Sequence, residues 1–74
     1  QPEINLSWLM DLAEMAITDA DGTVRVSGAE ILGRLVREGA GHPVGDQARS
    51  LLQPLQQDSD HRVVAAALNG LQSI

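Results

Sequence analysis

Three carboxylates are spaced along the chain as oxygen ligands of a calcium ion could be. Asp19, Asp21 and Glu30 occupy the first, third and twelfth positions of segment 19–30, and Ca²⁺ is bound by oxygens at such positions of a loop. The sixth position holds Val24, although such a loop turns sharply there and needs a glycine. The favoured interpretation is that Asp19 and Asp21 cap the following helix. A calcium-binding helical pair with a loop at 19–30 is the alternative.

A second polar cluster, formed by Asp58, Asp60 and His61, contains ligand types that a transition metal accepts. No second histidine lies one helical turn from His61, so the spacing of a zinc site is missing. These residues are instead expected to begin a helix. The sequence also has no nucleophile motif, phosphate loop or cysteine. It therefore predicts no enzyme activity, no cofactor and no metal site.

Length and charge restrict the classes of function further. Seventy-four residues fit one small domain, and 43% hydrophobic residues indicate a folded chain. Ten carboxylates against five arginines, with no lysine, give a net charge of −5. Nucleic acids and anionic membranes attract positive charge, so neither is an expected partner. No signal peptide or long apolar run is present, which predicts an intracellular protein, cytoplasmic or nuclear.

Four helical stretches, separated by three breaks, account for most of the chain. They are expected from about Glu3 to Ile17, from about Thr23 to Glu38, from near Val44, and after the capping segment 58–60. Pro54 should kink the third helix or end it early. The apolar residues expected to face the core are Leu9, Leu12, Ala13, Ala16, Ile17, Val24, Gly28, Ile31, Leu32, Leu35, Val36, Ala48, Leu51, Leu52, Leu55, Val63, Val64, Ala67, Leu68, Leu71 and Ile74.

The two halves of the chain repeat without a gap at a distance of 39 residues. The identical pairs fall on the apolar stripes and on the aspartates between helices, and they are Leu12 with Leu51, Asp19 with Asp58, Asp21 with Asp60, Val24 with Val63, and Leu32 with Leu71. A helix–turn–helix unit that repeats at this period is typical of an α-solenoid. The sequence thus predicts an all-α domain over 1–74, with repeats at about 3–38 and 43–74.

The pattern of the second half resembles a HEAT repeat, from the armadillo-like α-solenoids. Its leucines at 51, 52 and 55 are followed by the turn aspartates and by Val63-Val64, Ala67-Leu68 and Leu71. The first half is similar, and it alone carries the Val24-Arg25 pair with which the family opens the second helix. In the second half, Arg62 lies on the other side of the valines. The resemblance implies two stacked helical hairpins that bind proteins.

The chain begins at Gln1 and stops at Ile74 inside an apolar pattern, which suggests a piece of a longer solenoid protein. The function predicted on this basis is a non-catalytic scaffold for protein–protein interactions. Its partner would be another protein or the rest of its own solenoid. A HEAT-like subunit of a lyase-type enzyme, such as the phycobilin lyases, is a further alternative because similar repeats occur there.

Four side chains are candidates for contact with a partner. Arg25, Arg34 and Arg37 lie on the second expected helix and could bind an acidic surface. They could equally form a solvated helix face with local ion pairs. Trp8, the sole aromatic residue, could anchor an interface or belong to the core of the first helix pair.

Overall fold

The computed structural model describes residues 6–72, and every regular element within them is a helix. Helix α1 spans Leu6–Ile17, α2 spans Gly22–Glu38, α3 spans Pro43–Leu52 and α4 spans His61–Leu71. A short 3₁₀ helix, η1, covers Gln53–Gln57 between α3 and α4. The expected all-α class and four helices are confirmed. The expected helix start near Glu3 and the expected core residue Ile74 lie outside the described residues.

The helix boundaries follow from local chemistry. An Asp21 carboxylate oxygen accepts a hydrogen bond of 2.8 Å from the backbone N–H of Thr23 and so caps α2. Asp60 caps α4 in the same way through the N–H of Arg62, at 2.9 Å. The α-helical part of the third stretch ends at Leu52 and continues as η1, which contains Pro54. The expected early end of this helix is therefore confirmed, because proline lacks the N–H that the α-helical ladder needs.

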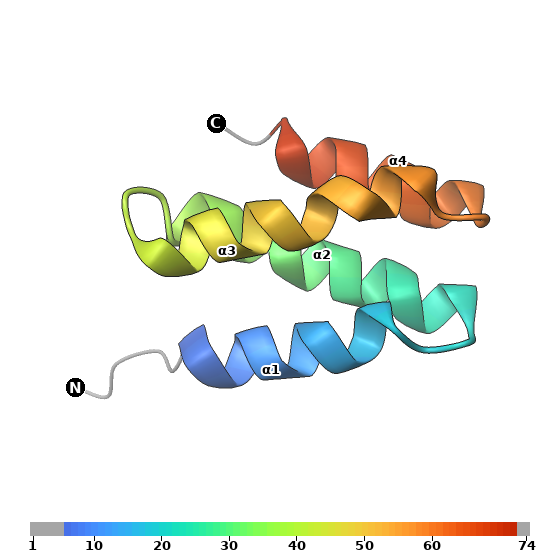
Figure 1. Ribbon diagram of the computed structural model, residues 1–74, viewed down its shortest axis with the longest axis horizontal. Coiled ribbons are helices and arrows are strands. Elements are labelled where there is room, and N and C mark those ends of the chain that lie inside the picture. Colours follow the sequence, from blue (N-terminus) through green and yellow to red (C-terminus); the bar gives the residue numbers. More distant parts are fainter. Residues whose placement is uncertain (1–5, 73–74) are drawn as a thin grey trace.

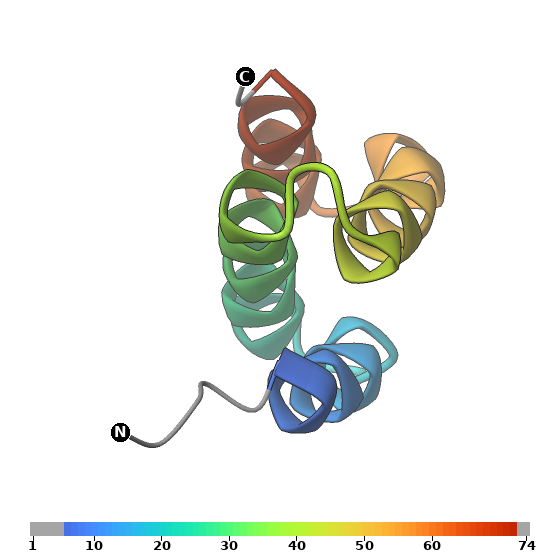
Figure 2. The ribbon, with the colours of Figure 1, turned by 90° about the vertical axis from the view of Figure 1, so that its left-hand side faces the viewer.

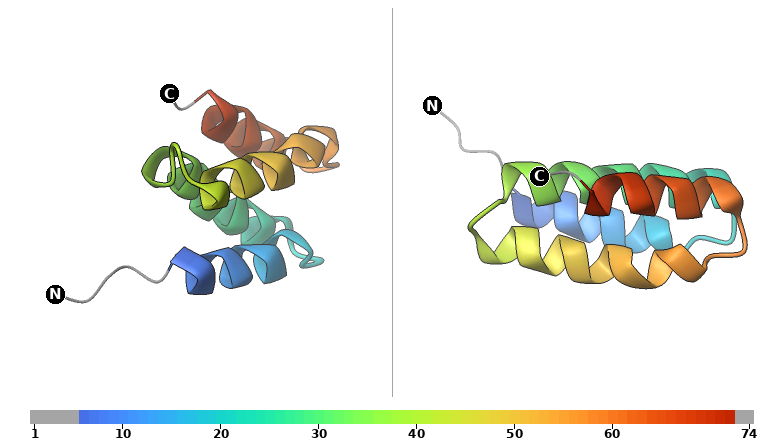
Figure 3. Two further views of the ribbon diagram at one scale, coloured as in Figure 1. Left: turned by 60° about the vertical axis from the view of Figure 1, so that its left-hand side comes forward. Right: turned by 90° about the horizontal axis from the view of Figure 1, so that it is seen from above.

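The helices form two antiparallel hairpins that pack on each other. We call α1 with α2 the first hairpin, and α3, η1 and α4 the second hairpin (Figure 1). Figure 2, which looks along the helices, shows α2 and α4 in one layer, with α1 and α3 on the same side of that layer. Seen from above, α4 overlaps α2 along its length (Figure 3, right). Helix α2 is central, because it packs against α1, α3 and α4.

The two hairpins share one core. Leu32, Leu35, Leu52 and Val63 are its largest fully buried side chains. The remaining buried apolar residues are smaller or lie nearer the edge, and they are Met10, Ala13, Ala29, Val36, Ala48, Leu55 and Ala67. Leucine and valine positions from both hairpins thus meet in a single cluster, and neither hairpin buries its apolar face alone.

Several apolar residues expected in the core are exposed instead. Leu12, Val24 and Leu68 have 40%, 37% and 40% of their surface accessible, and Trp8 has 60%, so the core interpretation of Trp8 is wrong. Met10, which was not expected in the core, is buried. Apolar residues cover more than one side of α1, and the side that packs on α2 is buried. Helical spacing alone does not say which side that is.

Helices α2 and α4 approach each other closely at two glycines. A Cβ atom built on Gly33 would lie 3.1 Å from the Cα of Gly70, and one built on Gly70 would lie 3.0 Å from the Cα of Gly33. Both distances are shorter than ordinary van der Waals contact, so backbone packs directly against backbone here. None of the helices within residues 6–72 combines the length and apolar character needed to cross a membrane.

Candidate functional site

Arg25 joins the turns of the two hairpins. Its Nε donates to one carboxylate oxygen of Asp58 over 2.9 Å, and its Nη2 donates to the other over 3.1 Å. Its Nη1 donates to the carbonyl oxygens of Asp19 and Ala20, both at 2.9 Å. The Arg25 and Asp58 side chains are only 15% and 11% exposed. We call this arrangement the Arg25 clamp, and it fixes the second hairpin to the turn of the first.

The clamp also shifts the pKa values of the two residues that form it. The hydrogen bond from Arg25, together with one from the backbone N–H of Asp60, lowers the pKa of Asp58. The same hydrogen bond raises the pKa of Arg25. Arg25 was predicted to contact a partner, but its guanidinium is used inside the chain. It is therefore left out of the binding surface described below.

Arg62 makes a second, more exposed link. Its Nη2 donates to Asp60 over 2.7 Å, and its Nη1 donates to the hydroxyl oxygen of Thr23 over 3.3 Å. The hydrogen bonds from the Arg62 side chain and backbone lower the pKa of Asp60 to about 2. Arg62 thereby connects the start of α4 to the start of α2.

Removal of the clamp is expected to destabilise the fold. Arg25→Ala leaves the largely buried Asp58 carboxylate without its bidentate partner, and the melting temperature Tm should fall by roughly 5–10 °C. Arg34→Ala is the matched control, because Arg34 forms an exposed i,i+4 pair with Glu38 at 2.8 Å. That control should change Tm by about 1–2 °C at most. Thermal unfolding followed by circular dichroism measures both variants.

The acid dependence of Tm provides an independent check of the same prediction. A carboxylate with a lowered pKa in the folded state stabilises the fold above its unfolded pKa, and this stabilisation is lost as pH falls through the folded pKa. The Tm of the parent chain should therefore fall as the pH is lowered from about 4 to about 2. The Tm of Arg25→Ala should fall by less over this range, because Asp58 no longer has its partner. Parallel profiles would show that Arg25 does not hold Asp58.

The segment 19–30 does not form a twelve-residue calcium loop. Residues 22–30 belong to α2, and the carboxylates of Asp19 and Asp21 accept backbone N–H groups of Asp21 and Thr23 at 2.8 Å each. Both aspartates thus act within the turn and the helix cap. Within the described part of the chain, no three His, Cys, Asp or Glu side chains gather as ligands for a metal ion.

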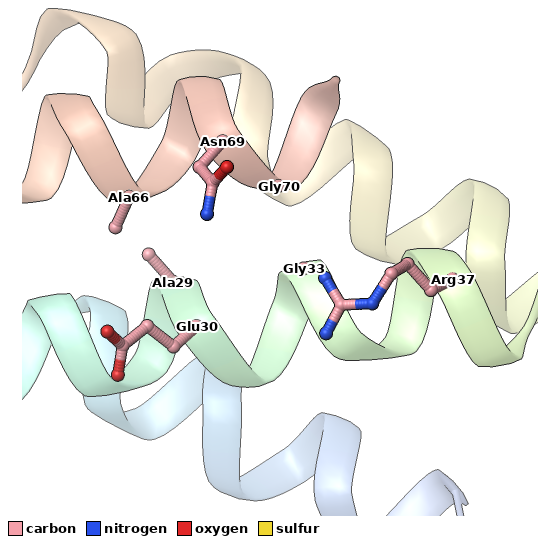
Figure 4. A pocket seen from close by; sticks show the side chains of 7 residues that line it. All are labelled: Ala29, Glu30, Gly33, Arg37, Ala66, Asn69 and Gly70. Carbon is pink, nitrogen blue, oxygen red and sulfur yellow. The ribbon is translucent and has the colours of Figure 1, made fainter. Parts of the chain in front are cut away.

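A shallow hollow of about 140 Å³ lies on the outer surface of the α2–α4 layer. Its floor consists of small residues, because α2 and α4 touch there through glycine. Polar side chains surround that floor (Figure 4): Asn69 points from α4 toward α2, and the guanidinium of Arg37 lies over Gly33. We call this feature the α2–α4 hollow, and its lining residues are Ala29, Glu30, Gly33, Arg37, Ala66, Asn69 and Gly70.

The candidate partner residues do not form one cluster. Arg37 lines the α2–α4 hollow, and Arg34 lies one turn before it on the exposed surface of α2. Trp8 is exposed on α1. Glu30 and Asn69 were missed by the sequence analysis. The signal that could have identified the hollow is the pair of glycines, Gly33 and Gly70, inside two helices.

No family model, curated protein or solved structure matches this chain.

Proposed function

We propose that the chain is a non-catalytic protein-interaction module made of two stacked HEAT-like repeats from a larger intracellular solenoid protein. The observation that carries the proposal is the pairing of equivalent helices. The second helices of the two hairpins, α2 and α4, pack against each other and lie side by side in one layer (Figure 2). The Arg25 clamp joins equivalent turns of the two repeats. Stacked hairpins of this kind are suited to holding an extended surface in a fixed shape.

The proposed binding surface is the outer side of the α2–α4 layer. Arg34 and Arg37 provide guanidinium groups there, and Asn69 provides an amide that can donate and accept hydrogen bonds. Guanidinium groups bind carboxylates through two parallel hydrogen bonds. The partner expected on this surface is an acidic segment of another protein, although the chain as a whole has a net charge of −5.

Site-specific photo-crosslinking in an extract of the source organism tests this proposal. A photoreactive residue at position 30, beside the hollow, should capture one defined protein. The same group at exposed position 50, on α3, should not. The double variant Arg34→Glu/Arg37→Glu should weaken binding at least tenfold, or by about 1.4 kcal/mol, and reduce the yield when the partner is below its Kd.

The matched control is Arg49→Glu, which reverses an exposed arginine on α3. It should leave the yield from position 30 unchanged. Equal capture from positions 30 and 50, or an unchanged yield in the double variant, would show that the partner does not bind this surface.

A further inference from the structure

Four large apolar side chains are exposed on the first hairpin. Trp8, Leu12 and Met15 follow each other at helical spacing along α1, with exposed fractions of 60%, 40% and 73%, and Val24 on α2 has 37%. The α1 residues lie on one side of the helix, away from buried Met10 and Ala13. We call these four residues the leading face.

The internal repeat indicates what kind of surface the leading face is. Leu12 and Val24 correspond, 39 residues later, to the identical residues Leu51 and Val63. In the second hairpin, Val63 is fully buried in the shared core and Leu51 packs against that core. The second hairpin therefore uses at these positions the same residue types that the first hairpin leaves exposed. Leu12 and Val24 thus mark a stacking surface for another hairpin, whereas Gln47 and Pro54, the counterparts of Trp8 and Met15, are exposed in the second hairpin as well.

The second hairpin has exposed apolar residues at positions that are buried or partly buried in the first hairpin. Val26 packs against the core and Ala29 is fully buried, both on the central helix α2. Their counterparts 39 residues later are Ala65 and Leu68 of α4, and both are exposed. We call Ala65 and Leu68 the trailing face. The chain thus carries both an exposed leading face and an exposed trailing face.

Charge favours contact between unlike faces over contact between two leading faces. Helix α1 contains two carboxylates, Asp11 and Glu14, and no basic residue. Two leading faces brought together would place four carboxylates near one interface. Helix α4 contains no carboxylate, so a trailing face avoids this repulsion.

We propose that the occupant of the leading face is the trailing face of a second copy of this chain, so that copies stack head to tail. This inference rests on the repeat stacking in the proposed function, but not on the α2–α4 hollow. Such an interface is heterologous, and it leaves one free face at each end of the assembly. Association should therefore continue beyond dimers as concentration rises.

The contact between copies lacks one interaction that the two hairpins have. Arg25 holds Asp58 within the chain, and the corresponding pair between copies would be position 64 with Asp19 of the next copy. Position 64 is a valine. Association between copies should therefore be weak, and Val64→Arg should strengthen it by providing a partner for Asp19.

Sedimentation velocity of the 74-residue chain over about 10 μM to 1 mM measures the association. The average mass of the parent should rise with concentration and exceed that of a dimer at the upper end. Leu12→Glu disables the leading face and Leu68→Glu disables the trailing face. Each variant alone should remain monomeric. Both residues are exposed, and circular dichroism should show unchanged helix content.

A mixture of the two variants gives the decisive result. Leu12→Glu retains its trailing face and Leu68→Glu retains its leading face, so an equimolar mixture should form dimers and nothing larger. If the parent chain associates, a mixture of the two variants that stays monomeric would overturn the proposal. Loss of association in Leu12→Glu but not in Leu68→Glu would also overturn it, by indicating two leading faces in contact. None of these outcomes alters the crosslinking expected from position 30.

If association is too weak to detect up to about 1 mM, two copies joined by a four-residue linker make the contact intramolecular and raise its effective concentration. The linker continues the 39-residue period across the junction. The linked protein should unfold at a higher temperature than the single chain, and Leu68→Glu in its first copy should remove that gain. Equal Tm values for the linked and single chains would refute head-to-tail stacking.

Discussion

Leu32→Ala is expected to lower the free energy of unfolding by about 2–5 kcal/mol. Leu32 is fully buried near the middle of α2, the helix that packs against α1, α3 and α4. Truncation removes buried apolar surface and leaves a cavity that the neighbouring helices fill only in part. A domain of this size is stable by about 4–11 kcal/mol in total. Urea denaturation followed by circular dichroism measures the loss.

Leu71 and Leu12 provide matched controls for this prediction. Leu71 is the repeat counterpart of Leu32 but is only half-buried at the end of α4, so Leu71→Ala should cost clearly less. Leu12 is 40% exposed, and Leu12→Ala should cost about 1 kcal/mol or less. If Leu32→Ala leaves no folded baseline, Leu32→Val should still show a loss of about 1 kcal/mol. Equal losses at positions 32 and 12 would contradict the helix packing described above.

Gly33→Leu is expected to destabilise the chain by about 1–3 kcal/mol, although leucine is the better helix former. The new side chain would meet the backbone of Gly70, since even a Cβ atom on Gly33 lies 3.1 Å from the Gly70 Cα. Backbone cannot rotate away as a flexible side chain can, so α2 and α4 must separate. The same substitution fills the α2–α4 hollow and should reduce crosslinking from position 30.

Ser27→Leu on the same helix is the control, because Ser27 is exposed. There the higher helix propensity of leucine acts alone and should leave stability unchanged or raise it by a few tenths of a kcal/mol. Chemical denaturation of both variants gives the sign of each change. A stabilising Gly33→Leu would mean that α2 and α4 are not in backbone contact.

The local structure of this chain was largely predictable from its sequence. Apolar periodicity predicted the helices, and the end of α2 at Glu38 agrees with it. Caps were expected at Asp19 and Asp21 and within residues 58–60, and the structure places them at Asp21 and Asp60, each of which accepts the backbone N–H two residues later. Pro54 was expected to kink the third helix or end it early, and the α-helical part ends at Leu52. These features depend on residues close together in the chain, so their physical causes are visible in the sequence itself.

The position of each side chain between helices depended on the tertiary structure. Arg25 and Arg34 both lie on the second predicted helix, and the sequence does not distinguish them. In the structure, Arg25 donates to the carboxylate of Asp58, 33 residues away. Leu12 has the same character as its counterpart Leu51, yet it is exposed because no described helix packs on that side of α1. Burial depends on which neighbours a helix has, and periodicity within one helix does not contain that information.

The candidate binding surface was likewise predicted only in part from the sequence. Arg34 and Arg37 were identified by type and by their place on the second helix. The hollow beside them requires Gly33 and Gly70, which are far apart in the chain, to meet across two helices. The sequence alone determined the helices, their caps and the repeat, because each depends on local chemistry or on self-similarity. The tertiary structure alone decided the Arg25 clamp, the α2–α4 hollow and the two exposed faces, because each depends on how the hairpins pack.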